Sequence, residues 1–305
     1  MAFPSIQRTQ LHCKQGAVRS VRFNVDGNYC MTAGADKSVK LWNPFKEILL
    51  QTYMGHGYEV LDVQSSSDSS HIASGGMDKC VFYWDVSTGQ IVRKYRGHAS
   101  YINAVKFNEE STVILSASVD NTVCAWDCRS KSREPIQIIR DAKDSVTSLS
   151  VSDHEILTAS LDHCVRRYDL RMGQLYQDDL GCPLNCVTFT KDGQCMLVSC
   201  LDNTIRLVDK DGGEVLSEYT GHKNENYRIE SCLNNTDALV VSGSEDGCIY
   251  AWDLIEHTQK HKGHKVVHSI AFHPSKPAML TAAEANVYLW MDTSENDNDD
   301  DNSDK

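Results

Sequence analysis

The sequence predicts an all-β fold, a seven-bladed β-propeller made of four-stranded antiparallel blades. The first observation is a unit that returns seven times, and each copy ends in an aromatic–acid pair or a degraded form of one. The pairs are Trp42-Asn43, Trp84-Asp85, Trp126-Asp127, Tyr168-Asp169, Val208-Asp209, Trp252-Asp253 and Trp290-Met291. Successive pairs lie 42, 42, 42, 40, 44 and 38 residues apart. A period of roughly 40 residues with four short strands per unit is typical of a propeller blade.

The second observation is the alternation of strands and turns inside each unit, which residues 55–96 show most clearly. Short runs with period-2 apolar patterning are separated by clusters of Gly, Ser, Asp and Asn, as expected for strands and tight turns. The four strands predicted for this unit cover residues 59–63, 72–75, 80–85 and 90–95.

The third observation is the way in which the two ends of the repeat complement each other. The last unit ends at Trp290, after its third strand, while Ile6–Leu11 forms an extra strand before the first unit. We therefore expect Ile6–Leu11 to pair with the last blade and close the ring, which leaves the blades with short, protected edges. One propeller domain is predicted over 1–291, with units ending near 43, 85, 127, 169, 209, 253 and 291. Residues 292–305 are predicted to be an acidic, disordered tail.

Composition narrows the classes of partner. The chain has 305 residues and a net charge of −12, half of which comes from residues 291–305 with seven acids and one lysine. A negative body makes direct binding of nucleic acid phosphates unlikely. Met1–Gln10 lacks the apolar centre of a signal peptide, and no run of about 18 apolar residues predicts a membrane span.

The twelve cysteines are read as buried apolar residues rather than as disulfides or ligands. Half of them alternate with apolar residues in or beside predicted strands, a placement typical of a reducing compartment. Cys124/Cys128 and Cys182/Cys186 are the closest pairs, and no Cys-x-x-Cys occurs, so no metal site and no cofactor is predicted.

Polar residues recur at fixed places in the units. Gly-His pairs open four units at Gly55, Gly97, Gly221 and Gly263, and an acid lies six residues before each Trp position. A hydroxyl precedes that acid by four residues in five units. In the last unit Thr281 precedes Glu284 by only three. Full sets are predicted in three units: His56, Ser74, Asp78, Trp84; His98, Ser116, Asp120, Trp126; and His222, Ser242, Asp246, Trp252.

Ser, His and Asp together suggest a hydrolase triad, but a catalytic centre is needed once and this set recurs. No Gly-x-Ser-x-Gly, Gly-x-x-x-x-Gly-Lys-Ser/Thr or His-Glu-x-x-His motif accompanies it. In an antiparallel blade the His loop and the Asp turn share one end, so the set is interpreted as a buried hydrogen-bond chain. No catalytic residues are predicted, and the protein is not expected to be an enzyme.

Units four and five depart from the pattern. They open with Asp141-Ala142 and Gly181-Cys182 in place of Gly-His, and they end in Tyr168 and Val208 in place of tryptophan. With the set broken, we predict that this sector opens more readily than units two and three.

Gly-His openings, an Asp in the tight turn and Trp-Asp endings identify the chain as resembling the WD-repeat family over residues 6–291. Four segments resemble more narrowly the WD-repeat scaffolds that organise mitogen-activated protein kinase modules: 21–30, 107–110, 151–157 and 165–175. That resemblance implies a protein-binding scaffold for Raf–MEK–ERK kinase-cascade components that also associates with spliceosomal proteins in mRNA splicing. It further implies a monomeric propeller within complexes, in the cytoplasm and the nucleus.

Candidate protein-binding residues on a rim are Tyr58, Tyr101 and Tyr227, which follow the Gly-His pairs. Exposed aromatic rings are favoured binding anchors, and the alternative is that each ring packs on its neighbouring blade. Arg166, Arg167 and Arg171 are expected to form a basic patch on unit four, either solvated or bound to an acidic partner or to the chain's own tail. Arg129, Arg166 and Arg171 are also candidate protein-binding residues of a rim.

A second functional reading rests on two arginines. Arg129 and Arg171 each lie two residues after the closing acid of consecutive units. That spacing resembles substrate receptors of cullin-type ubiquitin ligases, although arginine is also a common surface residue.

Overall fold

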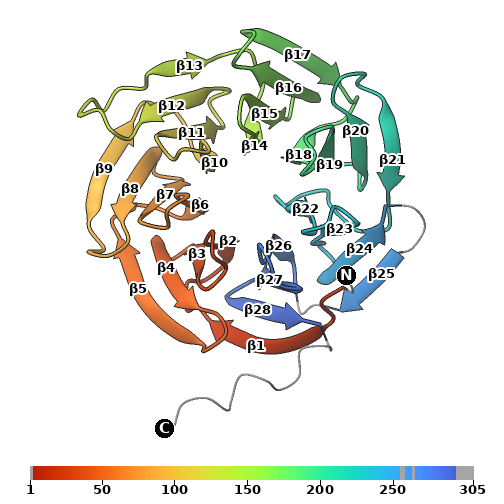
Figure 1. The fold of residues 1–305 in the computed structure, drawn as a ribbon, viewed down its shortest axis with the longest axis horizontal. Helices are drawn as coiled ribbons and strands as arrows, with labels where there is room; N and C mark the ends of the chain where they lie inside the picture. Colours follow the sequence, from red (N-terminus) through yellow and green to blue (C-terminus); the bar gives the residue numbers. More distant parts are fainter. Residues whose placement is uncertain (1–2, 255–257, 263–264, 293–305) are drawn as a thin grey trace.

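The computed structural model describes residues 3–254, 258–262 and 265–292. The Gly263-His264 pair and the predicted tail beyond Asp292 lie outside the described residues. The described chain forms 28 strands in seven four-stranded antiparallel sheets. The sheets stand around a central axis like the blades of a propeller (Figure 1).

The seven sheets are numbered blades 1 to 7 in chain order. Blade 1 holds β2 (Val18–Phe23), β3 (Cys30–Gly34), β4 (Ser38–Asn43) and β5 (Ile48–Met54). Blade 2 holds β6 (Val60–Ser65), β7 (His71–Gly76), β8 (Cys80–Asp85) and β9 (Ile91–Arg96). Blade 3 holds β10 (Ile102–Phe107), β11 (Val113–Ser118), β12 (Val123–Asp127) and β13 (Gln137–Ile139). Blade 4 holds β14 (Val146–Val151), β15 (Glu155–Ser160), β16 (Cys164–Asp169) and β17 (Gln174–Asp179).

The remaining blades complete the ring. Blade 5 holds β18 (Leu184–Phe189), β19 (Cys195–Cys200), β20 (Ile205–Asp209) and β21 (Val215–Tyr219). Blade 6 holds β22 (Ser231–Leu233), β23 (Leu239–Ser242), β24 (Cys248–Asp253) and β25 (Thr258–Lys262). Blade 7 holds β26 (Val267–Phe272), β27 (Ala278–Ala283), β28 (Asn286–Met291) and β1 (Ile6–His12).

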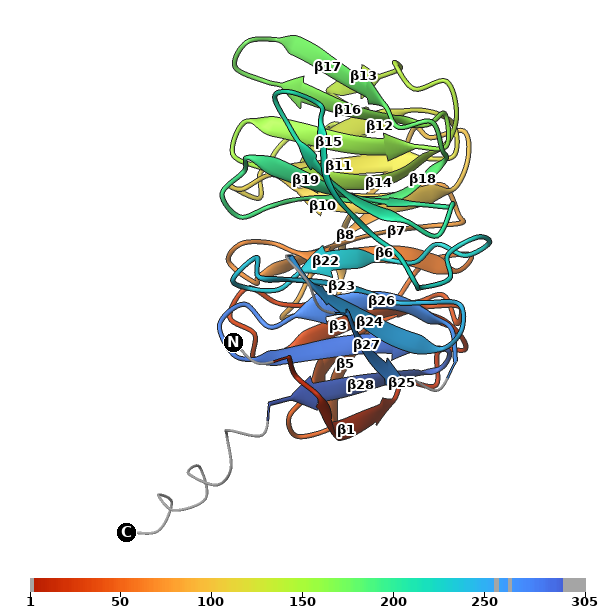
Figure 2. The same ribbon diagram turned by 90° about the vertical axis from the view of Figure 1, so that its right-hand side faces the viewer.

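The N-terminal strand closes the ring, as the sequence predicts. β1 pairs antiparallel with β28, from Ile6 opposite Met291 to His12 opposite Asn286, with one register shift between Gln7 and Thr9. The first and last strands of the described chain therefore belong to one sheet (Figures 1 and 2). The strand is one residue longer than the predicted Ile6–Leu11.

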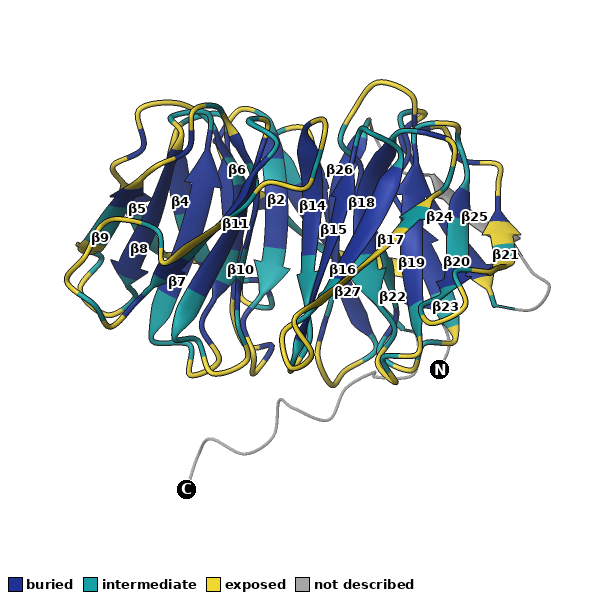
Figure 3. Cartoon of the chain, turned by 90° about the horizontal axis from the view of Figure 1, so that it is seen from above, coloured by how far each residue is buried: buried dark blue, intermediate teal, exposed yellow. Residues whose placement is uncertain are grey.

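The hydrophobic core lies between neighbouring blades. One cluster joins Tyr83 and Tyr95 of blade 2 to Ile102, Val105 and Trp126 of blade 3. A corresponding cluster joins blades 7 and 1. Burial is concentrated in the inner strands, and exposure in the loops of both rims and in the outermost strands (Figure 3). No helix in the described part of the chain is long and apolar enough to cross a membrane.

Residues at the start of the innermost strands also join the blades. The register shifts at this point in six blades, a β-bulge that turns one side chain toward the next blade. Asn103, Thr147 and Asn185 occupy such bulges. Their side chains donate hydrogen bonds to the carbonyl oxygens of Val146, Leu184 and Ile229, at 2.8, 2.9 and 3.1 Å.

Candidate protein-binding faces

The predicted hydrogen-bond chain is complete in blades 2 and 3. In blade 2, His56 Nδ1 lies 3.1 Å from each Asp78 oxygen, and His56 Nε2 lies 2.8 Å from Ser74 Oγ. The Trp84 indole N–H donates to the same hydroxyl at 2.8 Å. Because the ring nitrogen and the indole share one buried hydroxyl, each of these polar groups has a partner away from water.

Blade 3 repeats this geometry. His98 Nδ1 lies 3.0 Å from Asp120 Oδ2, His98 Nε2 lies 2.7 Å from Ser116 Oγ, and Trp126 Nε1 donates to Ser116 Oγ at 2.8 Å. Burial opposes a charge on His98, but hydrogen bonds to Asp120 and Cys124 raise the pKa of its imidazole to about 9. Burial likewise opposes the Asp120 charge, yet His98 and Thr122 hold the pKa of that carboxyl well below its usual range.

The third predicted set, in blade 6, is wrong as a connected chain. Both ring nitrogens of His222 are buried and have no hydrogen-bond partner among the described residues. Ser242 Oγ donates to the Gly243 carbonyl, and the Trp252 indole donates to the Thr220 carbonyl. The Tyr250 hydroxyl donates to Asp246 Oδ2 at 2.8 Å and takes the carboxylate that the histidine would use. Burial lowers the pKa of His222 to about 4.

Tyr250 belongs to a repeated position, four residues after the turn aspartate. In the two complete blades this position holds Phe82 and Cys124. In blades 1, 4 and 5 its side chain reaches back to the aspartate of its own blade: Lys40 to Asp36 at 3.6 Å, Arg166 to Asp162 at 2.7 Å and Arg206 to Asp202 at 2.9 Å. Blades 4 and 5 therefore hold their turns with a guanidinium where the histidine is missing.

Blade 1 uses an amide for the same purpose. The Gln15 side chain donates to the Ser38 carbonyl at 2.9 Å and accepts from the Thr32 hydroxyl. The Trp42 indole donates to Thr32 Oγ1 at 3.1 Å. In blade 7 the Trp290 indole donates to Thr281 Oγ1 at 2.8 Å, so the shorter turn before Glu284 still leaves the tryptophan with a hydroxyl partner.

The three candidate tyrosines lie on one rim of the ring. We call it the His–Asp rim, because the loops entering the first strands meet the turns between the second and third strands there, as the contact of His56 with Asp78 shows. The exposed fractions are 64% for Tyr58, 45% for Tyr101 and 46% for Tyr227. Each ring is therefore accessible. The Tyr227 ring also meets His268 of blade 7 edge-on at 5.7 Å.

The candidate arginines do not lie with the tyrosines. Arg129 and Arg171 follow β12 and β16 on the opposite rim, with side chains 72% and 64% exposed. Arg166 is fully buried and bound to Asp162, so its prediction as a rim residue is wrong. Arg167 is buried between Glu155, Asp211 and the Tyr176 ring. The predicted basic patch of unit four is therefore reduced to Arg171, which pairs with Asp153 at 2.6 Å.

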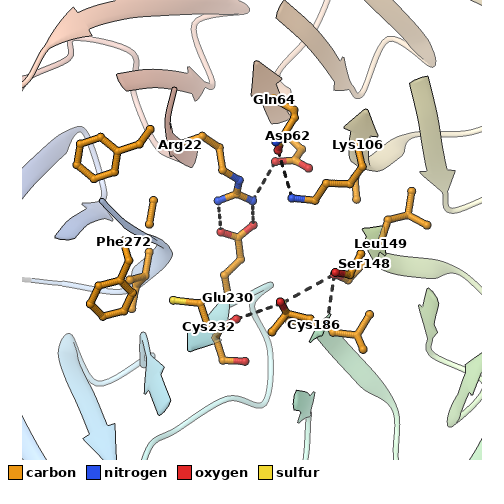
Figure 4. A pocket seen from close by; sticks show the side chains of 18 of the residues that line it. Arg22, Asp62, Gln64, Lys106, Ser148, Leu149, Cys186, Glu230, Cys232 and Phe272 are labelled. Atoms are coloured by element: carbon orange, nitrogen blue, oxygen red, sulfur yellow. Dashed lines mark hydrogen bonds and ion pairs between the residues drawn. The ribbon is translucent and has the colours of Figure 1, made fainter. Parts of the chain in front are cut away.

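The central channel contains a cavity of about 350 Å³ that the sequence did not reveal. Arg22 of blade 1 spans it, binding Glu230 of blade 6 at 2.5 and 2.7 Å and Asp62 of blade 2 at 3.2 Å (Figure 4). Burial opposes the Glu230 charge, but the Arg22 guanidinium lowers the pKa of that carboxyl. Lys106 of blade 3 donates to Gln64 at 3.3 Å beside this network.

Six stretches of the chain match the family model described as WD domain, G-beta repeat: residues 5–43, 47–85, 89–127, 176–209, 213–253 and 255–291. The chain belongs to the WD-repeat family. The matched stretches leave out 128–175, the repeat that has Tyr168 at the tryptophan position and Ala142 at the histidine position.

Three relatives show how closely this WD-repeat chain resembles known members of the family. WD repeat domain-containing protein 83 of Rattus norvegicus is 61% identical over 292 residues, which cover 95% of this chain and 93% of that protein. The Homo sapiens protein of the same name is 59% identical over 292 residues, with the same coverage. An uncharacterized WD repeat-containing protein of Schizosaccharomyces pombe is 48% identical over 280 residues, covering 90% of this chain and 94% of that protein.

Membership of the WD-repeat family sets the kind of site to expect. Propellers of this family generally mediate protein–protein interactions and are generally non-catalytic. The candidate binding residues that the structure leaves exposed lie on two faces: the tyrosines on the His–Asp rim, and Arg129 and Arg171 on the opposite rim. The sequence signal that could have paired Arg166 and Arg206 with the turn carboxylates is an arginine four positions after the turn aspartate in units four and five, which lack the histidine.

Proposed function

We propose that this protein is a non-catalytic scaffold that holds components of the Raf–MEK–ERK kinase cascade and also associates with spliceosomal proteins, in the cytoplasm and the nucleus. The resemblance of four segments to kinase-organising WD-repeat scaffolds supports this role, as does the identity of about three residues in five to the rat and human proteins. One observation carries the binding role: three exposed tyrosines stand on one rim, on loops whose backbones are held in place.

The loops that present the tyrosines are fixed by acids in neighbouring turns. Gly57 N–H donates to Asp78 at 3.1 Å and Ala99 N–H donates to Asp120 at 2.7 Å. Tyr227 N–H donates to Glu245 at 3.0 Å, as do the two preceding amides. Because these loops are ordered before a partner arrives, less conformational entropy is lost when a partner binds to the rings.

The Ser–His–Asp sets support a scaffold rather than a hydrolase. Ser74 and Ser116 are fully buried, and each hydroxyl already accepts the indole N–H of its blade's tryptophan. A catalytic serine must present its oxygen to a substrate carbonyl. These hydroxyls face the interior between blades, and the arrangement occurs twice, which suits a structural role.

The proposal is tested by changing the three rim tyrosines together. We expect Tyr58→Ala, Tyr101→Ala and Tyr227→Ala in one chain to reduce capture of kinase-cascade proteins in affinity purification with mass spectrometry. Tyr29→Ala is the matched control, because Tyr29 is 40% exposed in the β2–β3 loop of the opposite rim. Equal capture by the triple variant and the wild type would exclude the three tyrosines as the binding site for these proteins. Absence of kinase-cascade proteins from both would remove the kinase role.

A second candidate, a substrate receptor of a cullin-type ubiquitin ligase, is favoured by one observation. Arg129 and Arg171 stand exposed at the same position of consecutive blades, and their backbone N–H groups donate to Asp127 and Asp169 at 2.7 and 2.8 Å. This presents two similar arginines on consecutive blades of the opposite rim, beside Glu110 at 3.8 Å and Asp153 at 2.6 Å. Capture of the cullin adaptor that is unchanged by Arg129→Ala with Arg171→Ala would exclude this role.

A further inference from the structure

Blade 5 carries a pair of thiols at the place where other blades carry the histidine. Cys182 follows Gly181 at the position of His56 and His98, and Cys200 ends β19 close to it. Their sulfur atoms lie within 4.8 Å of each other and of a carboxylate oxygen of Asp202. Both thiols are free. The two segments are neighbours in the sheet, since Cys200 pairs with Leu184, two residues after Cys182.

Arg206 holds the thiol pair together. Its Nη1 lies 2.8 Å from Cys182 Sγ and 3.0 Å from Cys200 Sγ, while Nη2 and Nε bind Asp202 and Glu218, each at 2.9 Å. The two carboxylates fix the guanidinium beside the sulfurs. A thiolate is stabilised by such a neighbouring cation, and the thiolate is the nucleophilic form of cysteine.

The two thiols differ in how readily they ionise. The hydrogen bond from Cys200 lowers the pKa of Cys182 against the effect of burial, and Arg206 lowers it further. The same hydrogen bond and burial raise the pKa of Cys200. By contrast, burial raises the pKa of the Cys30 and Cys186 thiols, which have no such arginine contact. Geometry gives the same order, because Cys182 is the more exposed of the two and lies nearer to the guanidinium. Cys182 is therefore the attacking sulfur and Cys200 the sulfur that resolves the product.

Cys182 is 7% exposed and lies next to an open stretch of the surface. Gly181 has a left-handed backbone with φ of 73°, and an added Cβ there would meet nothing within 4 Å. The loop therefore faces solvent directly beside Cys182. Asp202 and Glu218 are partly exposed, so the guanidinium and the thiols lie just beneath the surface.

We propose that Cys182 and Cys200 form a redox pair that a hydroperoxide converts to a disulfide. The Cys182 thiolate attacks one peroxide oxygen, so an S–O bond forms, the O–O bond breaks, and the other oxygen leaves as hydroxide or alkoxide and takes a proton from water. Cys200 sulfur then attacks Cys182 sulfur. The S–S bond forms, the S–O bond breaks, and the departing hydroxyl leaves as water with the Cys200 proton. The peroxide is reduced by two electrons and the two thiols are oxidised.

A bound metal ion is the competing use of the same atoms. Two sulfurs and the Asp202 carboxylate are a group that zinc accepts. The guanidinium of Arg206 contacts all three of these residues, so a cation bound there would lie next to a fixed positive charge. The geometry therefore favours thiolate chemistry.

The disulfide would connect the loop entering β18 to the end of β19. Pro183 and Leu201, the next residues of the two segments, are already joined by a backbone hydrogen bond of 2.9 Å. Blade 5 lacks the histidine, the hydroxyl and the tryptophan that brace blades 2 and 3. Oxidation would supply a covalent brace at the same place on the His–Asp rim.

The test uses the full chain. The protein is first reduced, the reducing agent is removed, and an equimolar amount of hydrogen peroxide is then added. Alkylation and peptide mass spectrometry should find a Cys182–Cys200 disulfide, formed roughly tenfold faster than oxidation of Cys195. Cys195 is the internal control, because it is more exposed than Cys182 but burial and two neighbouring aspartates raise its pKa. Cys182 reacting no faster than Cys195 would overturn the proposal.

Four variants of the site and one control separate the roles of the residues. Cys200→Ser should trap sulfenic acid on Cys182, detected with dimedone, and Cys182→Ser should leave Cys200 unreacted. Arg206→Met should slow oxidation roughly tenfold, and Arg206→Lys should restore part of the rate. Arg129→Met is the matched charge-removing control on the opposite rim. Circular dichroism verifies that each variant is folded. An unchanged rate in folded Arg206→Met, or one zinc ion per purified chain that is lost in Cys182→Ser, would overturn the proposal.

Discussion

Ser74 shows how one hydroxyl supports two buried groups of different residues. It lies 2.8 Å from both His56 Nε2 and the Trp84 indole nitrogen. Removing the oxygen would leave both groups without a partner in a region that excludes water. An unsatisfied buried polar group costs about 1–3 kcal/mol.

We therefore expect Ser74→Ala to lower the free energy of unfolding by about 3 kcal/mol. Ser242→Ala is the control, because among the described residues the Ser242 hydroxyl bonds the Gly243 carbonyl alone, at 2.9 Å, and its loss should cost about 1 kcal/mol or less. Urea unfolding of both variants provides the comparison. Equal costs would show that the complete hydrogen-bond chain of blade 2 adds nothing beyond the single bond of blade 6.

His222 predicts a dependence of stability on pH. Its pKa is lowered to about 4 in the folded protein by burial, while an unfolded histidine titrates near 6.5. As pH falls below about 6.5, the unfolded chain takes up a proton that the folded chain refuses until about pH 4. The folded state is therefore destabilised over that window, by on the order of 2 kcal/mol at pH 5.

The matching experiment measures the free energy of unfolding at pH 7 and pH 5 for the wild type and His222→Phe. We expect the wild type to lose more stability between the two values than the variant does. His98→Phe should behave differently. The raised pKa of His98, about 9, means that its pairing stabilises the fold below about pH 6.5 and that this stability is lost as pH rises through 9. Identical pH dependence of wild type and His222→Phe would contradict the assignment.

The spacing of residues in the repeat correctly predicted the hydrogen-bonded sets of blades 2 and 3, eight residues in all. It failed for the four residues of the set in blade 6. His56 and His98 reach their partners because Phe82 and Cys124 do not compete for the turn carboxylates. His222 fails because Tyr250 donates to Asp246. The spacing shows which residue occupies each position of the repeat. It does not show which of two possible donors hydrogen-bonds to the turn carboxylate. Arg166 was misplaced for a related reason, since a charged residue buried by pairing looks the same in the sequence as an exposed one.

At the scale of the strand, Arg22 links four blades through the channel. It binds Glu230 and Asp62, and it lies 3.0 Å from the Ser269 hydroxyl. Arg19, three residues earlier on the same strand, pairs with Glu59 at 3.3 Å in a partly exposed setting. Substitutions of these two arginines therefore allow a buried ion pair to be compared with a partly exposed ion pair on the same strand.

We expect Arg22→Met to destabilise the protein by about 3–5 kcal/mol, because two buried carboxylates lose their bound guanidinium and Glu230 keeps the longer contact with Arg228 at 3.6 Å. Arg19→Met should cost under about 1 kcal/mol. Adding Glu230→Gln to Arg22→Met should recover part of the loss, since one uncompensated charge is removed. Chemical denaturation measures all three. A cost for Arg22→Met no larger than that for Arg19→Met would contradict the account of the channel.

Blades 4 and 5 should exchange backbone amide hydrogens faster than blades 2 and 3. Their turns are held by ion pairs instead of the histidine chain, and the pair in blade 5 is the more exposed of the two. Local opening is easier where few buried bonds must break. Hydrogen exchange with mass spectrometry should give the order blade 5, blade 4, then blades 2 and 3 from fastest to slowest. Equal protection of the backbone amides in blades 2 to 5 would contradict this prediction.

At the scale of the whole molecule, the repeat period and the unpaired strand Ile6–Leu11 were sufficient to predict a closed seven-bladed ring. Both are properties of chain order, and β1 pairs with β28 as expected. The channel network was not predictable in the same way. Arg22 and Asp62 come from consecutive repeats, but Glu230 comes from the sixth, and only closure of the ring brings it to Arg22. The split of the candidate residues between two rims also depends on the direction of each strand in the closed ring.

The most direct test of the scaffold account is a titration of the purified propeller into a fixed, dilute mixture of active MEK and ERK. A scaffold that holds both proteins makes their encounter effectively intramolecular, whereas excess scaffold separates them onto different copies. We predict that the rate of ERK phosphorylation rises and then falls as propeller is added, and that the triple tyrosine variant flattens this curve. A rate that stays constant at every concentration of the wild-type propeller would contradict the account.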